Sequence, residues 1–133
     1  MIECRLAADK LTARKVRWNA EYEGAPFELY VPRWRVPIPI PAVIYVGIEA
    51  VGDPADRSVS PSERPPSREP SRVPIVALVD KVREHTKTVR YRPHGQPDDW
   101  EIGEPYVPRG VLDAIGSGAD WPVTLRITVE WGT

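Results

Sequence analysis

Side chains that could perform acid–base or metal chemistry are few in this chain and poorly placed for it. The two histidines, His85 and His94, lie in polar surroundings with no cysteine nearby. An acidic segment surrounds a tryptophan and consists of Asp98, Asp99, Trp100, Glu101 and Glu104. Adjacent aspartates on an extended chain point in opposite directions and make a poor general acid/base pair. The oxygen spacing of a calcium loop is missing too, so we expect a solvated hairpin tip there.

Other motifs of catalysis are also absent. Gly116-Ser117-Gly118 lacks the lysine and the length of a phosphate-binding loop, and no serine lies in a nucleophile elbow. The single cysteine, Cys4, excludes an internal disulfide and a thiolate metal cage, and its apolar surroundings predict a buried side chain. We therefore expect no enzyme, no bound metal and no cofactor. An enzyme would need a pocket near Glu49 and Glu130, which we keep as a minor alternative.

One aromatic residue suggests recognition. Trp34 stands between Arg33 and Arg35 and is followed by prolines, so we expect it to be exposed. Tryptophan and arginine together are typical of protein-binding hot spots, and the indole could also stack on a base or a sugar. The alternative is that Trp34 caps the end of a barrel. The predicted partner-binding residues are Arg33, Trp34, Arg35 and Arg109.

Composition favours β structure and balanced electrostatics. Sixteen prolines in 133 residues disfavour helices and confine strands to edges, starts and bulges. With 18 basic and 19 acidic residues the net charge is −1, so a nucleic-acid site would have to be a local patch. No apolar stretch is long enough to span a membrane, and the N-terminus lacks the apolar core of a signal peptide. We expect a cytoplasmic protein, or one assembled into a particle inside the cell.

Residues 53–72 separate two β repeats, 1–52 and 73–133. This segment holds five prolines, five serines and no aromatic residue, so by itself it should form an extended linker. The flanking segments resemble each other in four blocks that occur in the same order. The matched blocks are Asp9-Lys10 with Asp80-Lys81, Val16-Arg17-Trp18 with Val89-Arg90-Tyr91, Tyr30-Val31-Pro32-Arg33 with Tyr106-Val107-Pro108-Arg109, and Ile44, Val46, Ile48 and Glu49 with Leu125, Ile127, Val129 and Glu130. This order predicts an internal duplication whose repeats share one core.

Each repeat reads as four strands. Residues 123–131 alternate apolar and polar side chains, and their counterpart 42–50 is apolar on both faces. Strands are also expected at 12–18 and 86–92, and each YVPR block should end a short strand at its proline. The one predicted helix covers residues 109–115, stopped by Gly116 or Gly118. The predicted fold class is therefore mostly all-β, with duplicated four-stranded units closing into one pseudo-twofold barrel or sandwich.

The second half resembles the AbrB/SpoVT swapped-hairpin fold of DNA-binding transition-state regulators. The resemblance covers Val107-Pro108, the segment from Leu112 to Gly116, and the strand from Leu125 to Val129. It implies two interleaved units in one barrel, and DNA contacts from basic residues on the early strands. The residues at those positions are Arg14, Lys15, Arg17, Lys87, Arg90 and Arg92. The slightly negative net charge and the acidic loop depart from that family's pattern.

Two functions follow as hypotheses. The leading one is a non-enzymatic protein-binding or assembly module, an accessory or structural subunit of a larger complex or virion. Its partner would be another protein or a second copy of the chain, as a homo-oligomer. The alternative is a nucleic-acid-binding barrel of the AbrB kind that acts as a regulator.

Overall fold

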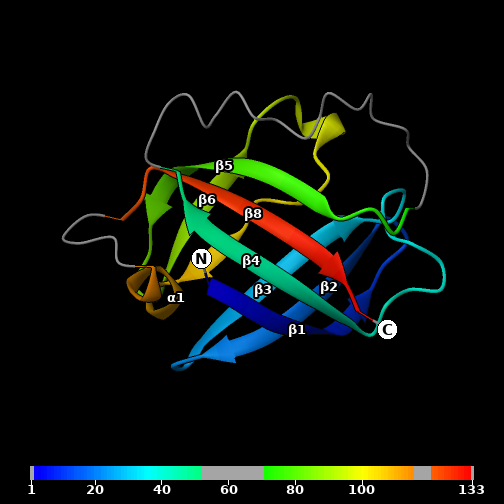
Figure 1. Ribbon diagram of the computed structural model, residues 1–133, viewed down its shortest axis with the longest axis horizontal. Coiled ribbons are helices and arrows are strands. Elements are labelled where there is room, and N and C mark those ends of the chain that lie inside the picture. Colours follow the sequence, from blue (N-terminus) through cyan, green and yellow to red (C-terminus); the bar gives the residue numbers. More distant parts are fainter. Residues whose placement is uncertain (1, 52–70, 116–120, 133) are drawn as a thin grey trace.

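The computed structural model describes residues 2–51, 71–115 and 121–132. Within these ranges, eight antiparallel strands form one closed barrel in the order β1-β2-β3-β7-β6-β5-β8-β4, which confirms the predicted fold class (Figure 1). The strands are β1 (Ile2–Leu11), β2 (Lys15–Tyr22), β3 (Ala25–Pro32), β4 (Val43–Ala50), β5 (Ile75–Glu84), β6 (Thr88–Pro93), β7 (Tyr106–Pro108) and β8 (Thr124–Trp131). Two short helices complete the list: the 3-10 turn η3 (Pro97–Asp99) and α1 (Arg109–Ala114). The glycines proposed to stop α1 lie outside the described residues.

Each half of the chain supplies four adjacent strands of the barrel. The first half runs β4-β1-β2-β3 around the wall and the second half runs β8-β5-β6-β7, so each is a Greek key. The halves meet at two seams, where β4 pairs with β8 and β3 pairs with β7. Closure pairs both outer strands of each unit with strands of the other unit, although β3 and β7 share a single register pair in the described part of the chain. No described helix is long and apolar enough to cross a membrane.

The core fills the inside of the barrel with alternate residues of each strand. On β4 and β8 the inward residues are Ile44, Val46, Ile48, Leu125, Ile127 and Val129, all fully buried. The barrel ends are closed differently. One end, called here the hairpin end, holds the β1–β2 hairpin and is filled by Val36 from a turn after β3. The other, the helix end, is filled by Val111 and Leu112 of α1.

Hydrogen bonds repeat between the halves at matched positions. The indole nitrogen of Trp18 donates to the carbonyl of Pro41 at 3.0 Å, and the hydroxyl of Tyr91 donates to the carbonyl of Pro122 at 2.7 Å. Backbone bonds repeat as well: Ala8 N to Ala42 O has its counterpart in Lys81 N to Val123 O. The two halves therefore make equivalent contacts about a pseudo-twofold axis. Their origin by duplication stays a prediction.

The first strands of the two halves align differently from the sequence match. In the β1–β2 pair, Asp9 is the extra residue of a bulge between Ala8 and Lys10. In the β5–β6 pair the extra residue is Val82, between Lys81 and Arg83. Asp9 is thus equivalent to Val82, and the match of Asp9-Lys10 with Asp80-Lys81 was wrong by two residues. The sequence match rested on identical residue types and did not take the strand register into account.

Half-buried Tyr22, with the buried thiol of Cys4 beside its hydroxyl, couples stability to pH. Burial, and then donation of the hydroxyl to the Cys4 sulfur, raise the pKa of Tyr22 to about 12. An unfolded tyrosine has a pKa of about 10, so between pH 10 and 12 the folded protein keeps a proton that the unfolded chain has lost. We expect this stabilisation to be complete below pH 10 and to disappear as pH rises through 12. Urea unfolding from pH 8 to 12 should show a shallower loss for Tyr22→Phe, and an identical slope would contradict the contact.

One near-isosteric substitution should measure how much the hydrogen bond from Tyr91 to Pro122 contributes to stability. Tyr91→Phe removes the donor to the Pro122 carbonyl and leaves that acceptor beneath a buried ring. Leaving a buried acceptor unsatisfied costs about 1–3 kcal/mol, so the free energy of unfolding at pH 7 should fall by that amount. Urea denaturation with unchanged m-value measures it. A variant as stable as the parent would mean that water replaces the hydroxyl.

Candidate seam groove

The weakest junction of the barrel lies between β3 and β7. Pro105 precedes β7 and Pro108 is its last residue, and neither has a backbone donor, which restricts this strand to three residues. Its only register pair with the eight-residue β3, among the described residues, joins Glu28 to Tyr106. Next to that pair, the loop of residues 94–105 contacts β3 through the hydrogen bond from the Gly103 amide to the Tyr30 carbonyl. This uneven junction leaves a groove on the outer face of the barrel.

The groove consists of three adjoining hollows and is called here the seam groove. The central hollow has a volume of about 460 Å³. It is lined by Arg14, Lys15, Tyr30, Pro32, Arg90, Pro97, Trp100, Ile102, Gly103, Glu104 and Tyr106. A hollow towards the hairpin end adds Ala13, Arg33, Trp34 and Asp98, and one over the pseudo-twofold axis adds Pro26, Glu28 and Thr88. Because neighbouring hollows share residues, together they form one continuous surface.

The loop of residues 94–105 is a fixed wall of the groove. Ile102 is fully buried in the barrel core, and the Gly103 amide donates to the Tyr30 carbonyl at 2.9 Å. The indole nitrogen of Trp100 donates to the Gly95 carbonyl at 3.2 Å, and Arg92 lies 5.4 Å from the centre of its ring. The expectation of a solvated hairpin tip therefore holds for residues 94–99, which are exposed, but not for Ile102, which is buried. Ile102 is the one aliphatic side chain in this loop, and it is the feature of the sequence that indicated burial there.

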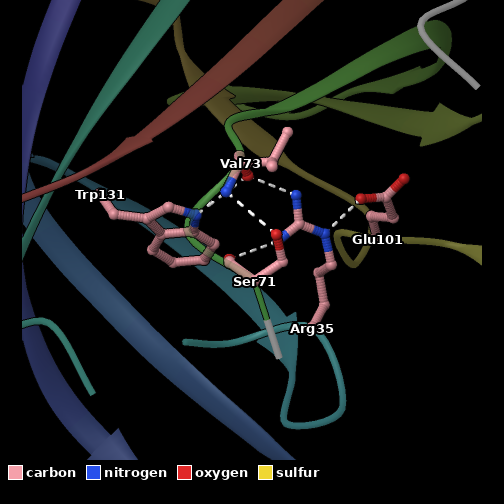
Figure 2. Close-up of polar contacts among 5 residues, drawn as sticks. All are labelled: Arg35, Ser71, Val73, Glu101 and Trp131. Atoms are coloured by element: carbon pink, nitrogen blue, oxygen red, sulfur yellow. Dashed lines mark hydrogen bonds and ion pairs between the residues drawn. The ribbon is translucent and has the colours of Figure 1, made fainter. Parts of the chain in front are cut away.

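Arg35 anchors this wall from inside. Its side chain is 2% exposed, and its Nε donates to the Glu101 carboxylate at 2.6 Å (Figure 2). Its two terminal nitrogens donate to the backbone carbonyls of Ser71 and Val73. Trp131 completes the surroundings, with its ring 5.9 Å from the guanidinium carbon and its indole nitrogen donating to the Val73 carbonyl. Arg35 therefore holds the structure together and does not face a partner, which corrects its place among the predicted contact residues.

The other predicted residues near Arg35 do reach the groove. Arg33 is exposed and Trp34 is half-buried, and both line the hollow at the hairpin end. Arg14 and Lys15 lie in the same region, with the Lys15 ammonium 4.4 Å from the centre of the Tyr30 ring. The structure thus brings together the tryptophan of one hypothesis and two basic residues of the other. Sequence reasoning had placed them at separate sites.

The centre of the groove is symmetric and electrically balanced. Tyr30 and Tyr106 are equivalent residues there, and Tyr106 is 41% exposed. Glu28 and Glu104 line it as well, and each is near an arginine: Arg17, outside the groove lining, lies 3.7 Å from Glu28, and Arg90 lies 3.4 Å from Glu104.

Arg17 and Arg90 differ in how strongly neighbouring carboxylates bind them. Arg17 has an additional bidentate pair with Asp9, at 2.8 and 3.0 Å. Hydrogen bonds, first to Asp9 and then to Tyr30, raise the pKa of Arg17. The pKa of Arg90 is raised too, mainly by a hydrogen bond with the Tyr106 hydroxyl. Val82 occupies the place of Asp9 in the second half, so Arg90 is the less neutralised of the two.

Lys87 and Arg109 lie at the helix end, away from the basic residues of the hairpin end. The Lys87 ammonium reaches the carbonyl of Gly24 in the β2–β3 turn. Arg109 donates twice to the His85 carbonyl, at 3.0 and 2.6 Å, as its equivalent Arg33 donates to the Thr12 carbonyl at 3.2 Å. The arginine of each YVPR block thus ties down the preceding hairpin. The six proposed DNA contacts therefore do not form one patch.

Acid–base and metal chemistry gain no support from the geometry. The described residues contain no cluster of three His, Cys, Asp or Glu side chains that could hold a metal ion. His94 pairs with Asp80 at 2.8 Å, and Asp80 in turn accepts from Thr124 at 2.7 Å, away from the groove lining. Glu49 is paired with Arg126 at 2.6 Å. The arrangement in the groove is suited to contact by aromatic faces and surface charges.

Replacement of the buried arginine should separate its role from that of its exposed neighbour. Arg35→Met removes the guanidinium that donates to Glu101 and to the carbonyls of Ser71 and Val73, while Arg33→Met removes one exposed contact. Breaking a buried pair costs about 3–5 kcal/mol, and the partial exposure of Glu101 reduces this to about 2–3 kcal/mol. Arg33→Met should cost less than about 1 kcal/mol. Urea unfolding of both variants measures the difference, and equal costs would contradict the anchoring role.

No protein-family model, no curated protein and no solved structure matches this chain.

Proposed function

We propose that this chain is a non-enzymatic protein-binding module that holds an extended segment of a partner protein in the seam groove. The observation that carries the proposal is the convergence of Tyr30, Tyr106 and Trp100 on one open surface, beside exposed basic residues. Aromatic residues and arginine supply most of the energy at protein interfaces. The central hollow of about 460 Å³, extended by the two adjoining hollows, accommodates several residues of an extended peptide but not a folded domain.

Rigidity of the groove supports binding over a merely structural role. Its wall is fixed by Ile102 in the core, by the bond from Gly103 to Tyr30, and by the ion pair between Arg35 and Glu101. A preformed surface avoids the entropy cost of ordering loops when a partner binds. A module of this kind would act as an accessory or structural subunit, with another protein or a second copy as its partner.

The nucleic-acid alternative rests on the same aromatic and basic pairing. Tyrosines and tryptophan beside lysine and arginine are typical of single-strand binding grooves. Two observations favour protein over nucleic acid. Glu28 and Glu104 lie at the centre of the groove, where they would repel phosphates. Lys87 and Arg109 are also too far along the barrel to extend the basic end.

Selection of random displayed peptides tests the proposal without knowledge of the natural partner. Twelve-residue peptides enriched on the folded protein should bind in the micromolar range by fluorescence anisotropy. Trp100→Ala should weaken them about tenfold or more, because stacking and burial on one aromatic contribute on the order of 1–3 kcal/mol.

A second tryptophan serves as the matched control. Trp121, like Trp100, packs against an arginine, but it lies at the helix end beside Arg109. Trp121→Ala should leave peptide affinity within about twofold, provided that circular dichroism shows both variants folded. Failure to enrich any peptide, or equal losses in the two variants, would count against a binding role for the groove.

A further inference from the structure

Charges are distributed unevenly along the seam groove. At the hairpin end it is lined by Arg14, Lys15 and Arg33, and none of these three forms an ion pair within the described part of the chain. Asp98 is the single carboxylate among the described residues that line this end. The hairpin end therefore carries unneutralised positive charge.

The middle of the groove differs in both charge and surface. There each glutamate of the lining is paired with an arginine, Glu28 with Arg17 and Glu104 with Arg90. Between these pairs the floor is formed by the rings of Tyr30 and Tyr106, with Pro26 at one side. A ligand that follows the groove thus meets cations at the hairpin end and aromatic rings with balanced charge further along.

Backbone geometry restricts the conformation of such a ligand. The facing edges of β3 and β7 already pair with each other through Glu28 and Tyr106, and the Tyr30 carbonyl accepts from Gly103. A peptide cannot add as a further strand at this seam, because the hydrogen-bonding groups it would need are occupied. Polyproline II chain needs no ladder of backbone hydrogen bonds and packs its rings against aromatic grooves.

We infer that the occupant is a proline-containing, acidic segment of a partner protein, bound in polyproline II form. Its carboxylates lie against Arg14, Lys15 and Arg33, and its prolines pack on Tyr30 and Tyr106. The acidic side chains of such a segment are complementary in charge to the basic residues at the hairpin end. Its prolines suit an aromatic floor that offers no strand edge. This inference rests on the proposed function and adds the chemistry of the partner.

Four fluorescein-labelled probes test it by anisotropy in 50 mM NaCl. They are a peptide of four glutamates followed by Pro-Pro-Ala repeats, the same peptide with lysines for glutamates, the acidic peptide with Gly-Ser repeats for the prolines, and a twelve-residue oligothymidylate. The acidic proline peptide should bind most tightly, and its affinity should fall as NaCl rises to 300 mM. The lysine and Gly-Ser peptides should each bind about fivefold or more weakly.

Pseudosymmetry supplies a matched pair of charge reversals. Arg14 and Lys87 occupy equivalent, exposed positions in the two hairpins, but only Arg14 lines the groove. Arg14→Glu should weaken the acidic proline peptide about fivefold or more, whereas Lys87→Glu, with the same change in net charge, should alter affinity less than about twofold. Both changes are at exposed positions, so folding should be unaffected.

The outcomes separate this inference from the proposed function. Preference for the lysine peptide, or equal losses in the two charge reversals, overturns the acidic partner but leaves peptide binding intact. Equal affinity for the Gly-Ser peptide overturns the polyproline form. Binding of no peptide probe, while displayed random peptides do bind, overturns the inference alone. Tightest binding of the oligothymidylate, lost in Arg14→Glu, overturns both and makes single-stranded nucleic acid the ligand.

Discussion

Closure of the barrel through a three-residue strand is the constraint on which the rest of this molecule depends. The eight described strands close into one barrel, yet Pro105 before β7 and Pro108 at its end allow only a brief junction with β3. Next to this junction, a loop that is pinned to the core by Ile102 bonds to β3 from Gly103 to Tyr30. The groove is a consequence of this arrangement, because a loop packed beside a strand does not form a flat surface.

Symmetry and its local loss have different roles in this structure. Where the two halves are equivalent, they perform the same structural task, as with the arginines that tie down each hairpin or the aromatic residues that bond to a proline carbonyl. Where they differ, the surface becomes distinctive. The tight β2–β3 turn of the first half is replaced by the loop bearing Trp100 in the second. The candidate site lies where that difference meets the pseudo-twofold axis.

Sequence reasoning reached the strands with strong alternation, residues 42–50 and 123–131, the helix at 109–115, and the barrel itself. Local pattern carries such information because burial on one face repeats every second residue. It did not reach Arg35, whose partners are 36 or more positions away in the chain. Nor did it reach Trp100 as a groove residue, because the surrounding acidic side chains predicted solvent. Both depend on contacts between distant segments, which spacing along the chain does not encode.

The division of the barrel into two contiguous Greek keys also affects how the polypeptide reaches this state. A chain made only as far as β4 has completed one unit, but its outer strands, β3 and β4, still await β7 and β8. During synthesis the β3 edge stands open until β7 has emerged, 58 residues after the end of β4 (Ala50 to Pro108), and the β4 edge until β8 has emerged, 81 residues after it (Ala50 to Trp131). Incomplete chains are therefore the species most exposed to edge-to-edge association with another nascent copy, and the pace of translation through the second half sets how long that hazard lasts.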